Sequence, residues 1–174
     1  MTFDEKLIDF FKRHNLYDKE MFGYIFEHSD QVDYYDPAEN FTIGCPPKTN
    51  KYTNKIEGLR LCYPYIVNEQ TRLVAVHEIS HAIYWYKRMG KKYNKIEEEL
   101  FPMIVERLYL EENRTQSLEV FEDKLDGLIT PTAPDRYKFA LANREKFEDR
   151  ELTDTRVFDK KSRKLLRKWK RENK

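Results

Sequence analysis

The sequence predicts an α+β fold that is mostly helical, with a small antiparallel sheet preceding a central helix. Three observations support this prediction. The chain has 174 residues, which suffices for one domain with a buried core. Apolar residues recur at helical spacing over most of its length. Between residues 41 and 66, two short β-type runs and several turn residues interrupt that spacing. We expect a single domain over residues 1–159 and a basic C-terminal tail or helix over residues 160–174.

Composition and charge exclude several classes of protein. Aromatic residues make up 14% of the chain, more than a disordered segment contains. No apolar run approaches membrane-spanning length, and the first residues lack the pattern of a signal peptide, so we expect a cytoplasmic protein without a membrane span. The net charge of +1 conceals an uneven distribution. Residues 160–174 contain nine Lys or Arg and one Glu, a charge of +8, so the preceding residues sum to −7.

The first half of the chain predicts two helices followed by strands. Apolar spacing indicates amphipathic helices over residues 3–13 and 18–28. Residues 41–45 and 59–66 have the composition of short strands, and Pro64 restricts the second to a sheet edge or a strand end. An edge strand at this place would accept an extended peptide by adding it to the sheet. A hairpin that only covers the core is the alternative.

The central helix is predicted over residues 69–89. Asn68 is a favourable N-cap residue at its start. Lys87 and Arg88 stand in the last turn, where cations interact favourably with the helix dipole, and Gly90 follows as a stop signal. The apolar face of this helix also carries two histidines, which places both imidazoles toward the interior of the domain.

The second half of the chain predicts helices alone. A long helix is expected over residues 96–113, where Pro102 is best tolerated in or near the first turn. Another helix is expected over residues 115–129. The proline-containing segment 130–134 breaks the helical pattern, which resumes over residues 135–150.

The chemical signal of the chain lies in the central helix. His77 and His81 are four residues apart, so they lie on one side of a helix, and Glu78 stands between them. Two converging imidazoles with a neighbouring carboxylate are what a catalytic zinc ion takes from a single helix. Two core histidines satisfied separately are the alternative, which leaves Glu78 and the spacing unexplained. Cys45 and Cys62 form no C-x-x-C motif, lie far from the histidines in sequence and are expected to be free thiols.

A catalytic zinc needs a third protein ligand, and we expect a glutamate from the following helix. On that helix Glu99 and Glu106 share a face with apolar residues, whereas Glu98 is turned away from it. The spacing favours Glu99, then Glu106, then Glu98. An acidic, solvated start to the helix would account for those carboxylates that bind no metal.

The segments His77–Tyr84 and Glu99–Glu106 resemble the active-site pattern of the thimet oligopeptidase and oligoendopeptidase family of gluzincins. In that family the zinc helix precedes a helix whose ligand glutamate stands before a proline, with a second glutamate seven residues later. The resemblance implies a compact zincin-like metallopeptidase in which Glu99 is the ligand and Glu106 supports it. It also implies an oxyanion-stabilising tyrosine from the C-terminal helices, for which Tyr137 is our choice.

The predicted activity is therefore zinc-dependent hydrolysis of peptide bonds in a peptide or protein substrate. His77, His81 and Glu99 would bind Zn²⁺ and leave one position for water. Glu78 would act as general base on that water and later protonate the leaving amine.

A different function class shares the same motif. Phage repressor-cleaving proteins and radiation-response regulators also carry a His-Glu-x-x-His helix on a small α+β body and bind or cut one specific partner. The basic segment over residues 160–174 fits such a role, because it would contact nucleic acid or an acidic partner. A solvated C-terminal helix docked on the body is the alternative for this segment.

Overall fold

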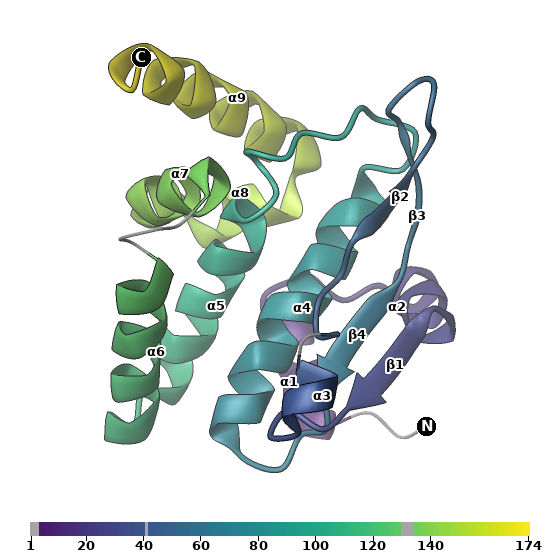
Figure 1. Cartoon of the computed structure of the whole chain (residues 1–174), viewed down its shortest axis with the longest axis vertical. Helices are drawn as coiled ribbons and strands as arrows, with labels where there is room; N and C mark the ends of the chain where they lie inside the picture. The colour runs from purple at the N-terminus through teal and green to yellow at the C-terminus, as the bar shows by residue number, and fades with distance from the viewer. Residues whose placement is uncertain (1–3, 41, 130–133) are drawn as a thin grey trace. The chain divides into compact units, whose positions relative to one another are not determined.

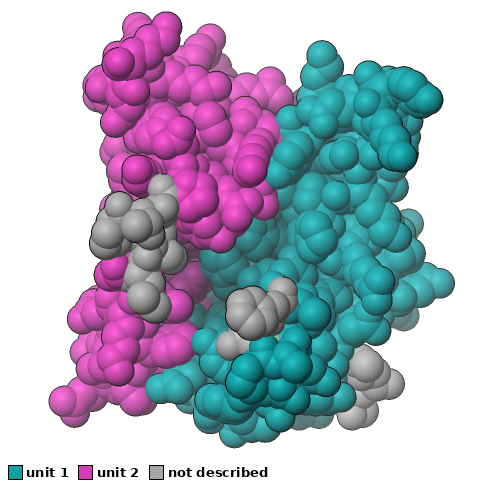
Figure 2. Space-filling view, in the orientation of Figure 1, with its two compact units in different colours: residues 1–93 teal, residues 94–174 magenta. Residues whose placement is uncertain are grey.

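The computed structural model describes residues 4–40, 42–129 and 134–174. It divides into two compact units, Met1–Tyr93 and Asn94–Lys174 (Figures 1 and 2). Helices dominate and the strands are short, which confirms the α+β class. Within the described ranges, no helix combines the length and the apolar character that crossing a membrane requires.

The first unit contains all the described strands and the central helix. Its elements, in chain order, are α1 (Glu5–Arg13), α2 (Lys19–Glu27), β1 (Ser29–Val32), α3 (Pro37–Asn40), β2 (Pro47–Thr49), β3 (Ile56–Leu59), β4 (Leu61–Pro64) and α4 (Glu69–Lys87). The two N-terminal helices and α4 therefore form where the apolar spacing predicts them. Asp4 and Asp18 cap α1 and α2 by accepting hydrogen bonds from backbone amides in the first turn.

The strands form two two-stranded sheets, of which only one is antiparallel. An antiparallel pair is present, but it is formed by β2 and β3, which lie almost entirely between the two predicted strands and not in them. The predicted strand over residues 59–66 corresponds to β4, which pairs in parallel with β1. The sequence of β1, Ser-Asp-Gln-Val, lacks apolar alternation, which explains why it gave no strand signal. Pro64 ends β4, as its missing amide hydrogen requires.

The predicted strand over residues 41–45 is reduced to a single bridge. Gly44 exchanges two backbone hydrogen bonds with Cys62, of 2.9 and 2.8 Å, on the edge of β4 opposite β1. Phe41 lies outside the described residues. At Cys62, β4 is therefore paired on both sides, and this point of the strand is closed to an added peptide.

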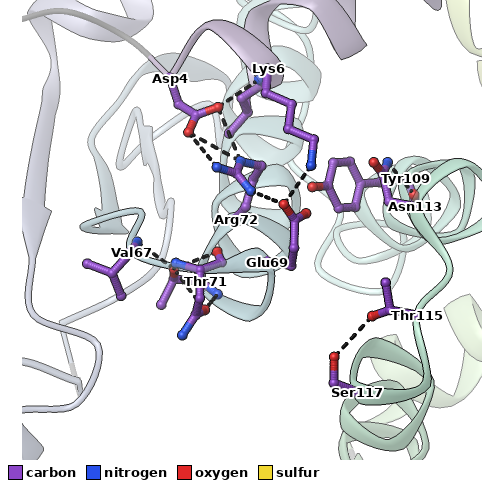
Figure 3. Close-up of polar contacts among 12 residues, drawn as sticks. Asp4, Lys6, Val67, Glu69, Thr71, Arg72, Tyr109, Asn113, Thr115 and Ser117 are labelled. Carbon is purple, nitrogen blue, oxygen red and sulfur yellow. Dashed lines mark hydrogen bonds and ion pairs between the residues drawn. The ribbon is translucent and has the colours of Figure 1, made fainter.

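The start of α4 is fixed by side-chain contacts (Figure 3). The backbone amide of Thr71 donates to the Asn68 side chain at 2.9 Å, and the backbone amide of Asn68 donates to the Thr71 hydroxyl at 3.1 Å. This reciprocal capping box satisfies two amides that the helix leaves unpaired. One turn on, Arg72 forms ion pairs with Asp4, at 2.9 Å, and with Glu69. The first turn of α4 is thus bonded to the residue that caps α1.

The interior of the first unit forms between α4 and its neighbours. The helix packs against β3, β4 and α2. Its inward side chains are fully buried, as are those of the strands and of the N-terminal helices; they include Phe10, Phe11, Phe22, Ile25, Leu59, Leu61, Leu73, Val76, Ile79, Ile83 and Trp85. Burial of this apolar surface is the main stabilising contribution to the unit and fixes the rotation of α4 about its axis.

The second unit is helical throughout its described residues. Its elements are α5 (Leu100–Asn113), α6 (Gln116–Ile129), α7 (Asp135–Asn143), the 3₁₀ turn η1 (Arg144–Lys146), α8 (Asp149–Thr153) and α9 (Thr155–Glu172). Contacts join α5 to α7 and η1, and join α9 to α7 and α8. The Arg107 guanidinium donates to the carbonyls of Arg144 at 2.8 Å and Phe147 at 3.1 Å, which holds the turn after α7 against α5.

Three helix predictions for this unit need correction. Residues 96–99 form turns, so α5 begins at Leu100 and Pro102 stands in its first turn, where it costs no hydrogen bond. The helix expected over residues 135–150 is interrupted by η1, because the chain turns there onto the Arg107 side chain. The basic segment expected from residue 160 belongs to α9, which begins at Thr155 after the Asp154 cap. Most of the expected break at 130–134 lies outside the described residues.

We predict that Asn68→Ala lowers the free energy of unfolding by about 1 kcal/mol, because it removes the capping oxygen from α4. Urea denaturation followed by circular dichroism measures the change. Asn68→Asp is the matched control, since it keeps the capping oxygen while losing the 2.8 Å bond that the amide donates to Tyr35. Equal losses in both variants would assign the effect to the Tyr35 contact instead of the cap.

Candidate metal-binding site

The two motif histidines lie one turn apart on α4. Their ring centroids are 5.0 Å apart, with the ring planes at 74°. His81 is buried, at 5% exposure, while His77 and Glu78 are half-buried. Val76 and Ile79 are fully buried, so the packing of these apolar neighbours fixes the rotation of the helix and leaves His77 and Glu78 in partial contact with solvent. The burial of His81 agrees with the interior position expected from the sequence, whereas His77 keeps partial exposure.

Trp85 and Cys45 extend the environment of the histidines within the first unit. The Trp85 ring stacks on the His81 ring at a centroid distance of 6.4 Å, and its indole nitrogen donates to the Cys45 carbonyl at 2.9 Å. Burial and the negative charge of Glu78 raise the pKa of the Cys45 thiol well above its usual value. Cys45 is thus distant from the motif in sequence but close to α4 in space. The protonated form that its raised pKa favours is a poor metal ligand.

Glu99 occupies the position directly before α5 in the second unit. Its backbone already has helical angles, with φ −88° and ψ −13°, and its side chain is buried at 3% exposure. The Arg136 guanidinium lies 3.9 Å from the Glu99 carboxylate and 3.1 Å from that of Glu98. One arginine is therefore shared by both carboxylates and offsets part of their charge.

Three side chains offer ligand atoms within reach of one ion. One nitrogen each of His77 and His81 and one carboxylate oxygen of Glu99 all lie within 4.8 Å of one another. Among the described residues, this is the group of three whose ligand atoms lie close enough together to hold one metal ion. It contains neither Glu98 nor Glu106. Two imidazoles and one carboxylate are a donor set that suits zinc, with one coordination position left for water. The residues therefore fit the metal that the motif predicts.

Tyr137 is held by the same arginine that contacts Glu99. Its ring lies 4.8 Å beneath the Arg136 guanidinium, and an Arg136 nitrogen is 3.4 Å from its hydroxyl. Tyr137 is half-buried near the start of α7. Sequence reasoning missed Arg136, because no motif or periodicity distinguishes it from the other arginines of the chain.

Glu106 belongs to a second group of carboxyls, inside the second unit. Its side chain forms a hydrogen bond with Glu122 on α6, and Arg144 forms ion pairs with Glu122 at 2.9 Å and with Asp126 at 3.1 Å. Burial, with contributions from Glu106 and Asp126, raises the pKa of Glu122 to about 9, although Arg144 acts in the opposite direction. The Glu106–Glu122 pair thus retains a proton at neutral pH. Glu122 was also missed from the sequence, because an acidic residue on an amphipathic helix is ordinarily solvated.

No family model, curated protein or solved structure matches this chain. The resemblance to the oligopeptidases therefore depends on the motif residues alone and stays a prediction.

We predict that Glu122→Gln reduces the pH dependence of stability. The wild-type folded state keeps a proton that the unfolded chain releases above its ordinary pKa of 4.5. Stability should therefore fall as the pH rises from 4.5 toward 9, by up to about 1.4 kcal/mol per pH unit. Glutamine is neutral and still donates to Glu106, so the variant should lose most of this slope.

Thermal unfolding between pH 5 and 9 measures this slope. Glu119→Gln is the control, since Glu119 lies on the same helix but is exposed and forms only a 3.7 Å ion pair with Arg114. A Glu122→Gln profile parallel to the wild-type profile would show that the pair holds no such proton.

Proposed function

We propose that the chain is a zinc-dependent metallopeptidase that hydrolyses peptide bonds. His77, His81 and Glu99 would hold the ion, and Glu78 would be the general base. The observation that supports this most is the grouping of two imidazole nitrogens and one carboxylate oxygen within 4.8 Å, with Glu78 next to His77 on the same helix. Such a bound ion would supply Lewis acidity that polarises a carbonyl and lowers the pKa of water to about 7.

The proposed role of Glu78 follows from its position on α4. Glu78 follows His77 directly in the middle of α4 and is half-buried, so its carboxylate remains accessible to solvent. A carboxylate at such a place can accept a proton from water and later deliver it to a leaving amine.

Arg136 and Tyr137 complete the proposal in the second unit. We assign Arg136 as a positioning residue, because its guanidinium contacts Glu98 and Glu99 and restricts the orientation of the ligand carboxylate. Tyr137 is the proposed donor to the oxyanion. Its hydroxyl lies beside the Arg136 cation, which stabilises negative charge on or near that oxygen.

We predict that Glu78→Gln abolishes peptide cleavage while zinc content stays stoichiometric, because glutamine keeps the size of the side chain but cannot accept the proton. Loss of a general base lowers kcat by roughly 10²–10⁴-fold. Cleavage of a quenched fluorescent peptide library measures the loss of activity. Mass spectrometry measures whether zinc is retained. Unchanged turnover in Glu78→Gln would remove this residue from the mechanism.

We predict that Glu99→Ala loses zinc, with a Kd raised by more than the roughly 10–100-fold expected for an outer-shell residue. Competition with a chromogenic chelator measures the affinity. Glu98→Ala is the matched control, since it removes a neighbouring carboxylate that also contacts Arg136. Retention of zinc by Glu99→Ala together with its loss in Glu106→Ala would transfer the ligand role to Glu106.

A further inference from the structure

The C-terminal helix α9 packs one face into the interior of the second unit. Phe158 and Leu166 are buried, and the Trp169 ring packs on Phe139 at a centroid distance of 5.9 Å. Lys161 also belongs to this packing, because its ammonium forms ion pairs with Glu151 at 2.8 and 2.9 Å. Phe158, Leu166 and Trp169 therefore hold α9 against the rest of the second unit, in which α9 contacts α7 and α8.

The exposed side of α9 is cationic over residues 160–171. From residue 160 to residue 171, every side chain classed as exposed is a lysine or an arginine, and no acidic residue interrupts the segment. We call these seven side chains the cationic face: Lys160, Arg163, Lys164, Arg167, Lys168, Lys170 and Arg171. They recur at intervals of three and four residues, which aligns them along the helix. At 1.5 Å per residue the face extends over about 16 Å.

The charge of this face is largely uncompensated. Lys168 has an ion pair at 3.8 Å with Glu172, an exposed contact of small energetic value. Among the described residues, no acidic group forms an ion pair with Arg163, Arg167 or the neighbouring lysine Lys164. Lys164 and Arg167 also line one surface concavity together with Arg171. Several cations held this close repel one another, so an anionic partner would relieve the repulsion.

We propose that the cationic face of α9 binds the phosphate backbone of double-stranded DNA without base specificity. Regularly spaced lysine and arginine groups on a helix suit a row of phosphates, and the release of counterions supplies the affinity. This proposal is independent of the metal site, because none of its residues belongs to the motif.

The structure disfavours three other anionic partners. A helix that binds a membrane surface inserts its apolar face, and that face of α9 is buried. Single-stranded nucleic acid is bound by stacking on exposed aromatic rings, and the cationic face contains none. An acidic protein surface would need apolar or aromatic anchors at the centre of the interface, which this face also lacks.

The test compares the full-length protein with the triple variant Lys164→Gln, Arg167→Gln, Arg171→Gln. Fluorescence anisotropy with a labelled 20-base-pair duplex measures the affinity over a series of salt concentrations. We expect the wild type to bind duplexes of different sequence equally. The variant should lose at least about tenfold in affinity at 0.1 M salt, and its salt slope should fall by about 0.9 for each cation removed.

The matched control is Lys51→Gln, Lys55→Gln, Lys124→Gln, which changes the net charge equally at exposed lysines outside α9. It should keep both the affinity and the slope. Equal losses in the two triple variants, or unchanged binding in the α9 variant, would overturn the proposal. So would tighter binding to phosphatidylserine vesicles, to polyglutamate or to the corresponding single strand than to the duplex. Circular dichroism confirms that each variant is folded.

Discussion

The candidate site depends on one constraint, the rotation of α4 about its own axis. Two imidazoles four residues apart share one face of a helix, and the rotation of the helix decides what that face meets. The apolar neighbours of the histidines fix that rotation, because any other orientation would expose Val76 or Ile79 to water. The Asn68 and Thr71 capping box fixes where the helix begins, and the Arg72 ion pair with Asp4 bonds this end to α1. Packing thus sets the geometry on which the proposed chemistry depends.

The parts of the structure that sequence predicts best are those governed by local rules. Helix α4 has a capping residue, an apolar stripe and a following glycine, and it forms within two residues of its predicted bounds. The order of preference among the three glutamates came from helical spacing, and the structure groups Glu99 with the histidines even though Glu99 itself precedes α5. The bounds of α4 and the preference for Glu99 among the three glutamates could therefore be inferred without coordinates.

The parts that sequence does not predict depend on contacts between distant residues. The parallel pairing of β1 with β4 joins segments about thirty residues apart, and β1 is too polar to suggest a strand. Cys45 reaches α4 through its carbonyl, which no side-chain pattern reveals. In the sequence, Arg136 and Glu122 look like any other charged residue of an amphipathic helix. Their contacts with carboxylates, such as Glu98 and Glu106, appear only in the folded structure. In each case a tertiary contact, and not the local pattern, determines the role of the residue.

The contacts of Arg136 have a consequence for substitution at this position. A guanidinium has a flat surface that lies on the Tyr137 ring and several nitrogens that reach two carboxylates in different directions. A lysine ammonium is a single charge at the end of a flexible chain, so it can satisfy one of these neighbours at a time. The exchange of one cation for the other would keep the charge of α7 and still leave Glu98, Glu99 and Tyr137 competing for it.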